Sequence, residues 1–414
     1  MTTLISNIKL LVNTREQHDL LRGKELAYLP CIEDAFLIIE DDHIAEYGSM
    51  KDVKLRVADF TSHFDAKGKM VLPSWCDSHT HLIFAGSREA EFVDKIKGLS
   101  YAEIAAKGGG ILHSAKKLNA TSEEELYKQA YNRLQEVIAL GTGAIEIKSG
   151  YGLSVEGELK MLRVIQRLKR NSKIPVKSTF LGAHAIPPEY KENRQGYIDL
   201  IINEMLPLIA KENLADFIDV FCEEGFFTPE ETKTICNAGK AIGLKPKIHA
   251  NQLSVSGGVQ TGVNLGAVSV DHLESMDEDA INSLANSSTI GTLLPTAAFF
   301  LRMPFQPARK LIDSNCAIAL ASDFNPGSSP SGNMNFVVSL SCIQMKMLPE
   351  EAINAATING AWAMELQNEV GSMTVGKKAN LIITKEIPSL AFLPYSFGTN
   401  LIDKIVLNGE WMEN

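Results

Sequence analysis

The 414-residue sequence lacks the features of a membrane or exported protein. It contains no run of 18 apolar residues, so we expect no membrane-spanning helix. Its first residues, MTTLISNIKLLVNTREQ, have no basic segment followed by an apolar core and a small-residue cleavage site, so we expect no signal peptide. Positive charges are outnumbered, with 40 Lys and Arg residues against 50 Asp and Glu residues. The formal net charge of −10 disfavours a broad basic surface for nucleic acid.

Cysteine is rare as well, and its placement is uninformative for disulfides. The six cysteines are scattered, and none stands in a Cys-x-x-Cys pair. In a chain of this length, buried reduced thiols are the default interpretation, and they fit a reducing compartment. We therefore predict a cytoplasmic protein that binds neither nucleic acid nor membrane.

Both ends of the chain are rich in short β-type patterns. LISNIKLLV, AFLIIEDDHIAEYG and KMVLP lie near the start, and GSMTVGKKANLIITK and NLIDKIVLNGEWM lie near the end. Apolar residues broken by Gly and Asp are typical of strands joined by turns. We predict a discontinuous small β-sandwich domain from residues 1–70 and 371–414, which encloses a second domain over 71–370.

The middle of the chain alternates short apolar runs with helical patterns. Helical stretches such as EGELKMLRVIQRLKRN repeat apolar residues at spacings of three and four. Such alternation favours a parallel sheet, and eight strands fit a closed (β/α)₈ barrel. An open doubly wound sheet is the alternative, although no Gly-x-Gly-x-x-Gly follows the first strand. The eight runs are VLPSWCDSH, GAIEIKSGYG, VKSTFLGAH, DFIDVFCEEG, PKIHANQ, AVSVDHLE, IGTLLPTA and AIALASDFNPG.

Metal-ligand side chains follow three of these strands. His79 and His81 end strand one, His249 ends strand five and Asp323 ends strand eight. In a barrel the carboxyl ends of the strands meet on one face, where active sites are built. Three imidazoles and one carboxylate suit a borderline divalent ion such as Zn²⁺ or ferrous iron. Each signal is weak by itself, but their joint occurrence predicts a metal site.

Four further residues are candidates for the same face, and each has a structural alternative. His272 ends strand six and could be a hydrogen-bonded core histidine. His184 ends strand three and could bond a neighbouring loop. Tyr151, after strand two, could be a packing aromatic, and Arg88, after strand one, could pair with a nearby glutamate at the surface. The residues alone leave these alternatives open.

Several segments together resemble the amidohydrolase superfamily. The resemblance covers essentially the whole chain. Within the superfamily it is closest to the hydrolases that open 4-imidazolone-5-propanoate in histidine degradation. His-x-His marks only the superfamily, whereas AG-x-R-x-x-EF, KSGYGL and SDFNPGS are much more specific. The segments that carry the resemblance are HTHLIFAGSREAEF, KSGYGL, FLGAHAIPPE, FCEEGFF, HANQLS, DHLE, LPTAAFFLR and ASDFNPGS.

The resemblance implies an activity and a set of site residues. It implies hydrolysis of the ring lactam C–N bond of 4-imidazolone-5-propanoate by a metal-activated water, which gives N-formimidoyl-L-glutamate. It implies one Zn²⁺ or Fe ion as the cofactor, held by His79, His81, His249 and Asp323. It also implies substrate or product contacts from Arg88, Tyr151, His184, Gln252, Asn325, Gly327 and Ser328.

The chemistry of three residues agrees with this activity. Asp323, next to both metal and water, can take a proton and pass it to the departing nitrogen. His272 can donate a hydrogen bond to the developing oxyanion. Arg88 offers a planar fork for the propionate carboxylate of a small anionic substrate. Whether Asp323 or His272 is the general base stays open.

Other functions remain as competing hypotheses. A deaminase of an aromatic heterocycle is the nearest, but related deaminases carry Glu where this chain has Gln252, and an amide cannot shuttle protons. Strand four ends in Cys222, Glu223 and Glu224, with no Lys to be carbamylated, so a bridged two-metal site is disfavoured. A metal-free scaffold would be expected to lack some ligands. The sequence fixes neither the native metal nor the oligomeric state, for which a homodimer is our working assumption.

Overall fold

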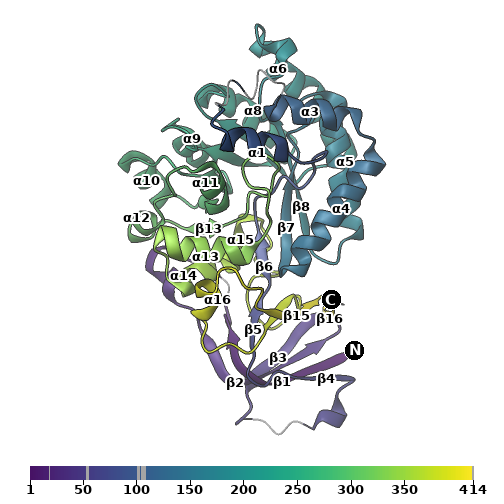
Figure 1. Cartoon of the computed structure of the whole chain (residues 1–414), viewed down its shortest axis with the longest axis vertical. Helices are drawn as coiled ribbons and strands as arrows, with labels where there is room; N and C mark the ends of the chain where they lie inside the picture. The colour runs from purple at the N-terminus through teal and green to yellow at the C-terminus, as the bar shows by residue number, and fades with distance from the viewer. Residues whose placement is uncertain (18, 53–55, 100–102, 104–108, 413–414) are drawn as a thin grey trace.

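The protein consists of a barrel and a separate sheet that lies at one end of it (Figure 1). The computed structural model describes residues 1–17, 19–52, 56–99, 103 and 109–412. Within these residues, no helix is long and apolar enough to cross a membrane.

Eight parallel strands form the barrel in chain order, each paired with the next. Their residues are almost all buried, as expected for strands covered by helices on the outside. The predicted barrel is confirmed, and the open doubly wound alternative is wrong. The strands are β6 (Trp75–Asp77), β7 (Thr142–Lys148), β8 (Val176–Ala183), β9 (Phe217–Cys222), β10 (Lys245–Ala250), β11 (Ser269–His272), β12 (Ile290–Leu293) and β13 (Ile318–Leu320).

The barrel closes just beyond the ends of β6 and β13. A single parallel bridge joins Thr80 to Phe324. Beside it, the Asp323 amide donates to the His79 carbonyl at 3.0 Å. Below it, the Asp77 carboxylate accepts from both the amide (2.9 Å) and the hydroxyl (2.6 Å) of Ser322. The seam of the barrel therefore brings the segment after β6 against the segment after β13.

Helices surround the barrel, and side chains cap several of them. Ser154 caps α5 through a bond from the Gly157 amide, and Thr228 and Glu231 form a capping box on α8. The helices are α1 (Glu89–Ile96), α3 (Gly110–Ala120), α4 (Glu123–Ala139), α5 (Val155–Asn171), α6 (Arg194–Leu200), α7 (Leu206–Glu212), α8 (Pro229–Ala241), α9 (Gly258–Leu265), α10 (Glu278–Ala285), α11 (Pro295–Leu301), α12 (Ala308–Asp313), α13 (Met334–Met345), α14 (Pro349–Ala356), α15 (Ile358–Ala363) and α16 (Phe392–Tyr395). Short 3₁₀-helices lie at η1 (Gly23–Ala27), η2 (Val57–Asp59) and η3 (Pro188–Tyr190), and η4 (Ile201–Met205) is a short π-helix.

The second sheet joins the two ends of the chain, as predicted. Its order is β16-β15-β14-β5-β1-β2-β3, and β4 also pairs with β1. Ile5, Leu37, Leu381 and Val406 lie in one apolar cluster, so N- and C-terminal strands share a core. The domain limits given above remain our prediction. The strands are β1 (Thr2–Val12), β2 (Cys31–Glu40), β3 (His43–Ser49), β4 (Ser62–Asp65), β5 (Met70–Pro73), β14 (Leu381–Thr384), β15 (Ile402–Leu407) and β16 (Glu410–Trp411).

Candidate metal centre and active site

Four predicted metal ligands converge at the barrel seam. The Asp323 Oδ1 atom lies 3.6 Å from Nε2 of His79 and 3.6 Å from Nε2 of His81. The His81 and His249 Nε2 atoms are 3.4 Å apart. Each of the four residues is buried. The ligand atoms of His79, His81 and His249 lie within 4.8 Å of one another, a spacing that one ion can bridge.

Two buried carboxylates orient the histidines from behind. The His79 Nδ1 atom lies 2.6 Å from Asp271 Oδ2 on β11. The His249 Nδ1 atom lies 2.9 Å from Asp219 Oδ2 on β9, which also accepts from the His249 amide at 3.1 Å through Oδ1. A carboxylate at Nδ1 keeps the proton on that nitrogen and leaves the Nε2 lone pair free. The His79 ring therefore presents an unprotonated nitrogen to the centre, and the close approach of Asp219 favours the same tautomer for His249.

These residues fit a divalent cation. Nε2 of His79 has no hydrogen-bond partner among the described residues. Burial lowers the pKa of His79 and of His81 well below the usual value, and neighbouring cationic groups lower it further. Neutral imidazoles and a carboxylate that face one another without donors repel unless a cation lies between them. The donor set matches Zn²⁺ or Fe²⁺ chemistry.

His272 lies beside the same centre. Its ring is 5.2 Å from that of His249 and 5.6 Å from that of His79, and its Nδ1 atom is 3.6 Å from Glu274 Oε1. Burial disfavours its charged form, but Glu274 and other nearby carboxylates outweigh burial and raise its pKa. Ligand atoms of His79, His272 and Asp323 also lie within 4.8 Å of one another. His272 is thus placed to act as a donor at the centre.

The predicted substrate residues of strands two and three lie against His81. The His184 ring stacks on it with centres 5.3 Å apart and planes at 16°, and Tyr151 lies 5.8 Å away. His184 also contacts a loop, because its Nδ1 lies 3.0 Å from the Gly150 carbonyl. Burial lowers the pKa of His184 to about 3, so its ring is neutral at neutral pH. The loop-bonding alternative therefore holds for His184 without removing it from the site.

Arg88 reaches the site from the start of α1. Its guanidinium carbon lies 5.9 Å from the centre of the Tyr151 ring, and its Nε donates to Ser114 at 2.8 Å. The Nη2 atom is buried and has no partner among the described residues. A Cβ atom at Gly327 would lie 2.4 Å from Arg88 Nη1, so a side chain at this position would push the guanidinium out of its place. One arm of the fork is therefore free to bind an anion.

The loop after β13 folds around its own polar groups. Asn325 Nδ2 donates to the Asp323 carbonyl (2.6 Å), and its Oδ1 accepts from the amides of Gly327 and Ser328 (2.8 Å each). The Ser328 hydroxyl donates to Asp323 Oδ2 at 3.1 Å. The predicted product residues thus surround Asp323. Gln252 follows β10 and is largely buried, two residues beyond the end of the strand.

Comparison with known proteins identifies the family. The model of the Amidohydrolase family matches residues 226–412. Imidazolonepropionase of Christiangramia forsetii is 58% identical, over 99% of this chain and 100% of the relative. That of Clostridium tetani is 44% identical, over 94% of this chain and 92% of the relative. The chain belongs to the imidazolonepropionase family. It is accordingly a metal-dependent hydrolase.

Solved structures share the fold of this imidazolonepropionase family member. A variant of the atrazine chlorohydrolase TrzN from Arthrobacter aurescens, complexed with zinc and atraton, superposes with a TM-score of 0.73 at 13% identity, over 99% of this chain and 94% of the other. Guanine deaminase of E. coli superposes with a TM-score of 0.72 at 14% identity, over 100% of this chain and 99% of the other. At these identities the likeness shows the fold alone.

Sequence reasoning missed a charged network inside the barrel, directly behind the predicted metal ligands. Lys148 on β7 donates to Glu146 at 2.6 Å and to Asp219 at 2.8 Å, and it lies 3.7 Å from Asp271. Lys247 on β10 donates to the other oxygen of Glu146 and to the Ser78 carbonyl. Burial disfavours a charged Lys148, but its carboxylate partners outweigh burial and raise its pKa. The network holds both orienting carboxylates of this imidazolonepropionase family member.

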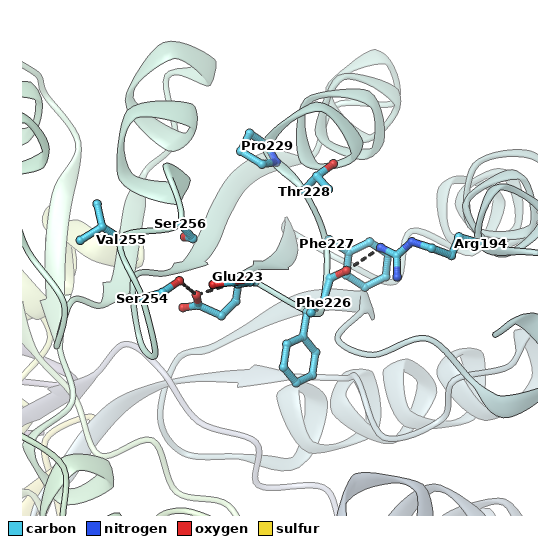
Figure 2. A pocket seen from close by; sticks show the side chains of 11 residues that line it. Arg194, Glu223, Phe226, Phe227, Thr228, Pro229, Ser254, Val255 and Ser256 are labelled. Carbon is cyan, nitrogen blue, oxygen red and sulfur yellow. Dashed lines mark hydrogen bonds between the residues drawn. The ribbon is translucent and has the colours of Figure 1, made fainter. Parts of the chain in front are cut away.

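A separate pocket lies outside this centre, between the loops after β9 and β10 (Figure 2). It contains none of the predicted metal ligands or substrate residues. The Glu223 carboxylate in it accepts from the Ser254 hydroxyl, and Arg194 donates to the Phe226 carbonyl (Figure 2). Glu223 also accepts from the backbone amides of Glu224 and Leu253. These polar groups are hydrogen-bonded to one another. Their role is therefore to hold the two loops together, and they are not available to bind a ligand.

Proposed function

We propose that this chain hydrolyses 4-imidazolone-5-propanoate to N-formimidoyl-L-glutamate. The observation that carries the proposal is the placement of a complete His₃Asp donor set and Arg88 at one barrel mouth in a member of the imidazolonepropionase family. The substrate is a small anion with a cyclic amide. The site offers a cation centre for the amide and a guanidinium for the carboxylate.

His79, His81, His249 and Asp323 would hold one divalent ion, for which we propose Zn²⁺ or Fe. When bound, this ion lowers the pKa of a water molecule and polarises the amide carbonyl. The orienting carboxylates Asp271 and Asp219 keep two of the ligating rings in the required tautomer.

Asp323 is the proposed proton carrier. Its Oδ1 faces the histidine nitrogens, while its Oδ2 accepts from Ser328. One oxygen is thus at the centre, and the carboxylate can take a proton from water and return it to the leaving ring nitrogen. His272 would donate a hydrogen bond to the oxyanion that develops at the carbonyl. Either a protonated ring or a neutral ring with its hydrogen on the nitrogen that faces the centre can make this donation.

The remaining residues would bind and orient the substrate. Arg88 would hold the propionate through its free Nη2, and Tyr151 would pack beside it. His184 and Gln252 would contact the ring. Asn325, Gly327 and Ser328 would lie at the product carboxylate side of the site. We retain a cytoplasmic location and a homodimer as predictions.

The test follows the loss of the substrate and the release of ammonia, which together distinguish ring opening from deamination. Purified enzyme should abolish the ultraviolet absorbance of 4-imidazolone-5-propanoate and release no ammonia, because ring opening keeps every nitrogen in the product. His249→Ala protein, which lacks one ligand, is the control and should be inactive. Ammonia release at the rate of absorbance loss would support the deaminase alternative, and unchanged absorbance would refute the proposal.

A further inference from the structure

A buried glutamate on α5 binds the loop that carries Tyr151. Glu158 is fully buried, and three backbone amides donate to its carboxylate. Its Oε2 accepts from Gly150 at 3.0 Å, and its Oε1 accepts from Gly152 at 2.8 Å and from Leu153 at 2.9 Å. Both oxygens are therefore engaged in fixing the direction of the loop peptides.

The loop needs such an acceptor because its backbone is unusual. Gly150 has φ 111°, and Leu153 has φ 52°, a left-handed conformation that costs free energy for a residue with a side chain. The loop also packs tightly on the helix, since a Cβ atom at Gly152 would lie 2.3 Å from the Glu158 amide nitrogen. Without the carboxylate, three amides pointing into a buried space would lose their partner.

The backbone of Gly150 links Glu158 to His184 through two successive peptide groups. Its N–H donates to Glu158, and the Gly150 carbonyl lies 3.0 Å from His184 Nδ1. A carbonyl oxygen can only accept, so Nδ1 must carry the hydrogen. The neutral ring then has an unprotonated Nε2, which is a hydrogen-bond acceptor. The ring stacks on His81, so this acceptor belongs to the candidate active site.

We propose that Glu158 is a positioning residue. By holding the backbone of Gly150, it fixes the tautomer of His184 and makes the His184 Nε2 atom an acceptor for a ring N–H of the substrate. The substrate part rests on the proposed function. The tautomer part does not. This relay from Glu158 through Gly150 to His184 favours a cyclic amide or amidine that presents an N–H to His184 Nε2. It disfavours a ring that presents only an acceptor there.

The substitution Glu158→Gln tests the relay with almost no change in shape. The Gln oxygen can still accept from Gly152 and Leu153, but its NH₂ group would face the Gly150 N–H, donor against donor. The Gly150 backbone should then shift away from the introduced Gln side chain, and the Gly150 carbonyl should leave His184 Nδ1. Glu156→Gln is the matched control, because Glu156 lies on the same helix but is exposed.

The first measurement is the ¹⁵N spectrum of zinc-loaded protein labelled at histidine, with the His184 signals assigned by their loss in His184→Asn. The native protein and Glu156→Gln should show a single His184 tautomer, with hydrogen on Nδ1. Glu158→Gln should show the Nε2–H tautomer as a major species. A single unchanged tautomer in Glu158→Gln would overturn the proposal, whatever the activity.

The second measurement separates positioning from simple loop stability. Glu158→Gln should lower kcat/KM by roughly tenfold, the effect of one lost hydrogen bond of about 1.4 kcal/mol. In a His184→Asn background the same substitution should add little, because it acts through His184. A full tenfold loss in that background would overturn the relay. If native protein shows the predicted tautomer but no ring opening, the proposed function fails and the tautomer assignment stands.

Discussion

At the scale of single residues, Asp323 has two roles, one in the proposed metal site and one in the closure of the barrel. It is a proposed ligand of the cation, and its backbone forms part of the barrel seam. Its φ of 52° is uncommon for a residue with a side chain. Such strain persists where the surroundings impose it, and here the hydrogen bonds of Asn325 and Ser328 do so.

Asp323→Asn should separate metal binding from proton transfer. Asn keeps a carbonyl oxygen for the metal but cannot accept a proton, so much of the metal should remain. Loss of a general base costs about 10² to 10⁴ in rate, and we expect kcat to fall by that amount with a smaller change in KM. Metal content and steady-state kinetics check this. Full metal content with near-normal kcat would show that another residue is the base.

If His272 is the base, His272→Ala should lose the acidic limb of the pH–rate profile, and Asp323→Asn should keep it.

Arg88→Met should mainly raise KM. A charge-assisted contact contributes roughly 1.5–3 kcal/mol, so kcat/KM should fall by about one to two decades. Arg88→Lys should recover part of the loss, because lysine carries the charge but lacks the fork. The control is Lys97→Met, an exposed residue at the end of the same helix. Unchanged kcat/KM in Arg88→Met would make Arg88 a structural residue.

At the scale of the strands, the sequence predicted the polar residues at the strand ends better than the charged residues within the strands. His249 and Asp323 follow apolar runs, so barrel geometry alone places them at one mouth. The network residues stand within the runs, where a charge interrupts an apolar pattern. Their signal was a spacing of two, as in Glu146 and Lys148, which places both side chains on the same face of a strand. Which lysine meets which carboxylate depends on strand register, and a single sequence does not fix that.

Asp271→Asn should weaken metal binding although Asp271 is not a proposed ligand. Its carboxylate receives the His79 Nδ1 hydrogen, which raises the basicity of the other ring nitrogen. Loss of such a partner typically lowers metal affinity by roughly 10- to 100-fold. Competition with a chromophoric chelator measures the effect, and Asp216→Asn, a carboxylate nearer the surface, is the control. Equal affinity in both variants would contradict the orienting role.

Lys148→Met should destabilise the barrel itself. The substitution leaves Glu146 and Asp219 buried with less compensation, and removing one partner of a buried pair costs about 3–5 kcal/mol. Urea denaturation of the native protein and the variant measures this loss. Lys169→Met removes a partly exposed pair with Asp216 and should cost less than about 1 kcal/mol. Similar losses in the two variants would show that the network adds no special stability.

At the scale of the whole molecule, the proposed metal site and the closure of the barrel coincide. His79 and His81 follow the first strand, and Asp323 follows the last, on either side of the Thr80–Phe324 bridge. One ion would therefore join the two edges of the sheet. The two-part architecture was predictable because both chain ends are β-rich and the middle alternates. The role of Asp77 in the seam was not, because it depends on the meeting of β6 and β13, far apart in sequence.

The central claim is that one divalent ion in this site is required for ring opening. The most direct test is to strip the protein with a chelator, add Zn²⁺ or Fe²⁺ back in steps and follow the ultraviolet absorbance of 4-imidazolone-5-propanoate. We predict no turnover in the stripped protein, and activity that rises linearly and saturates at one ion per chain. His249→Ala should not recover under the same conditions. Full activity in verified metal-free protein, or saturation only at two ions per chain, would contradict the account.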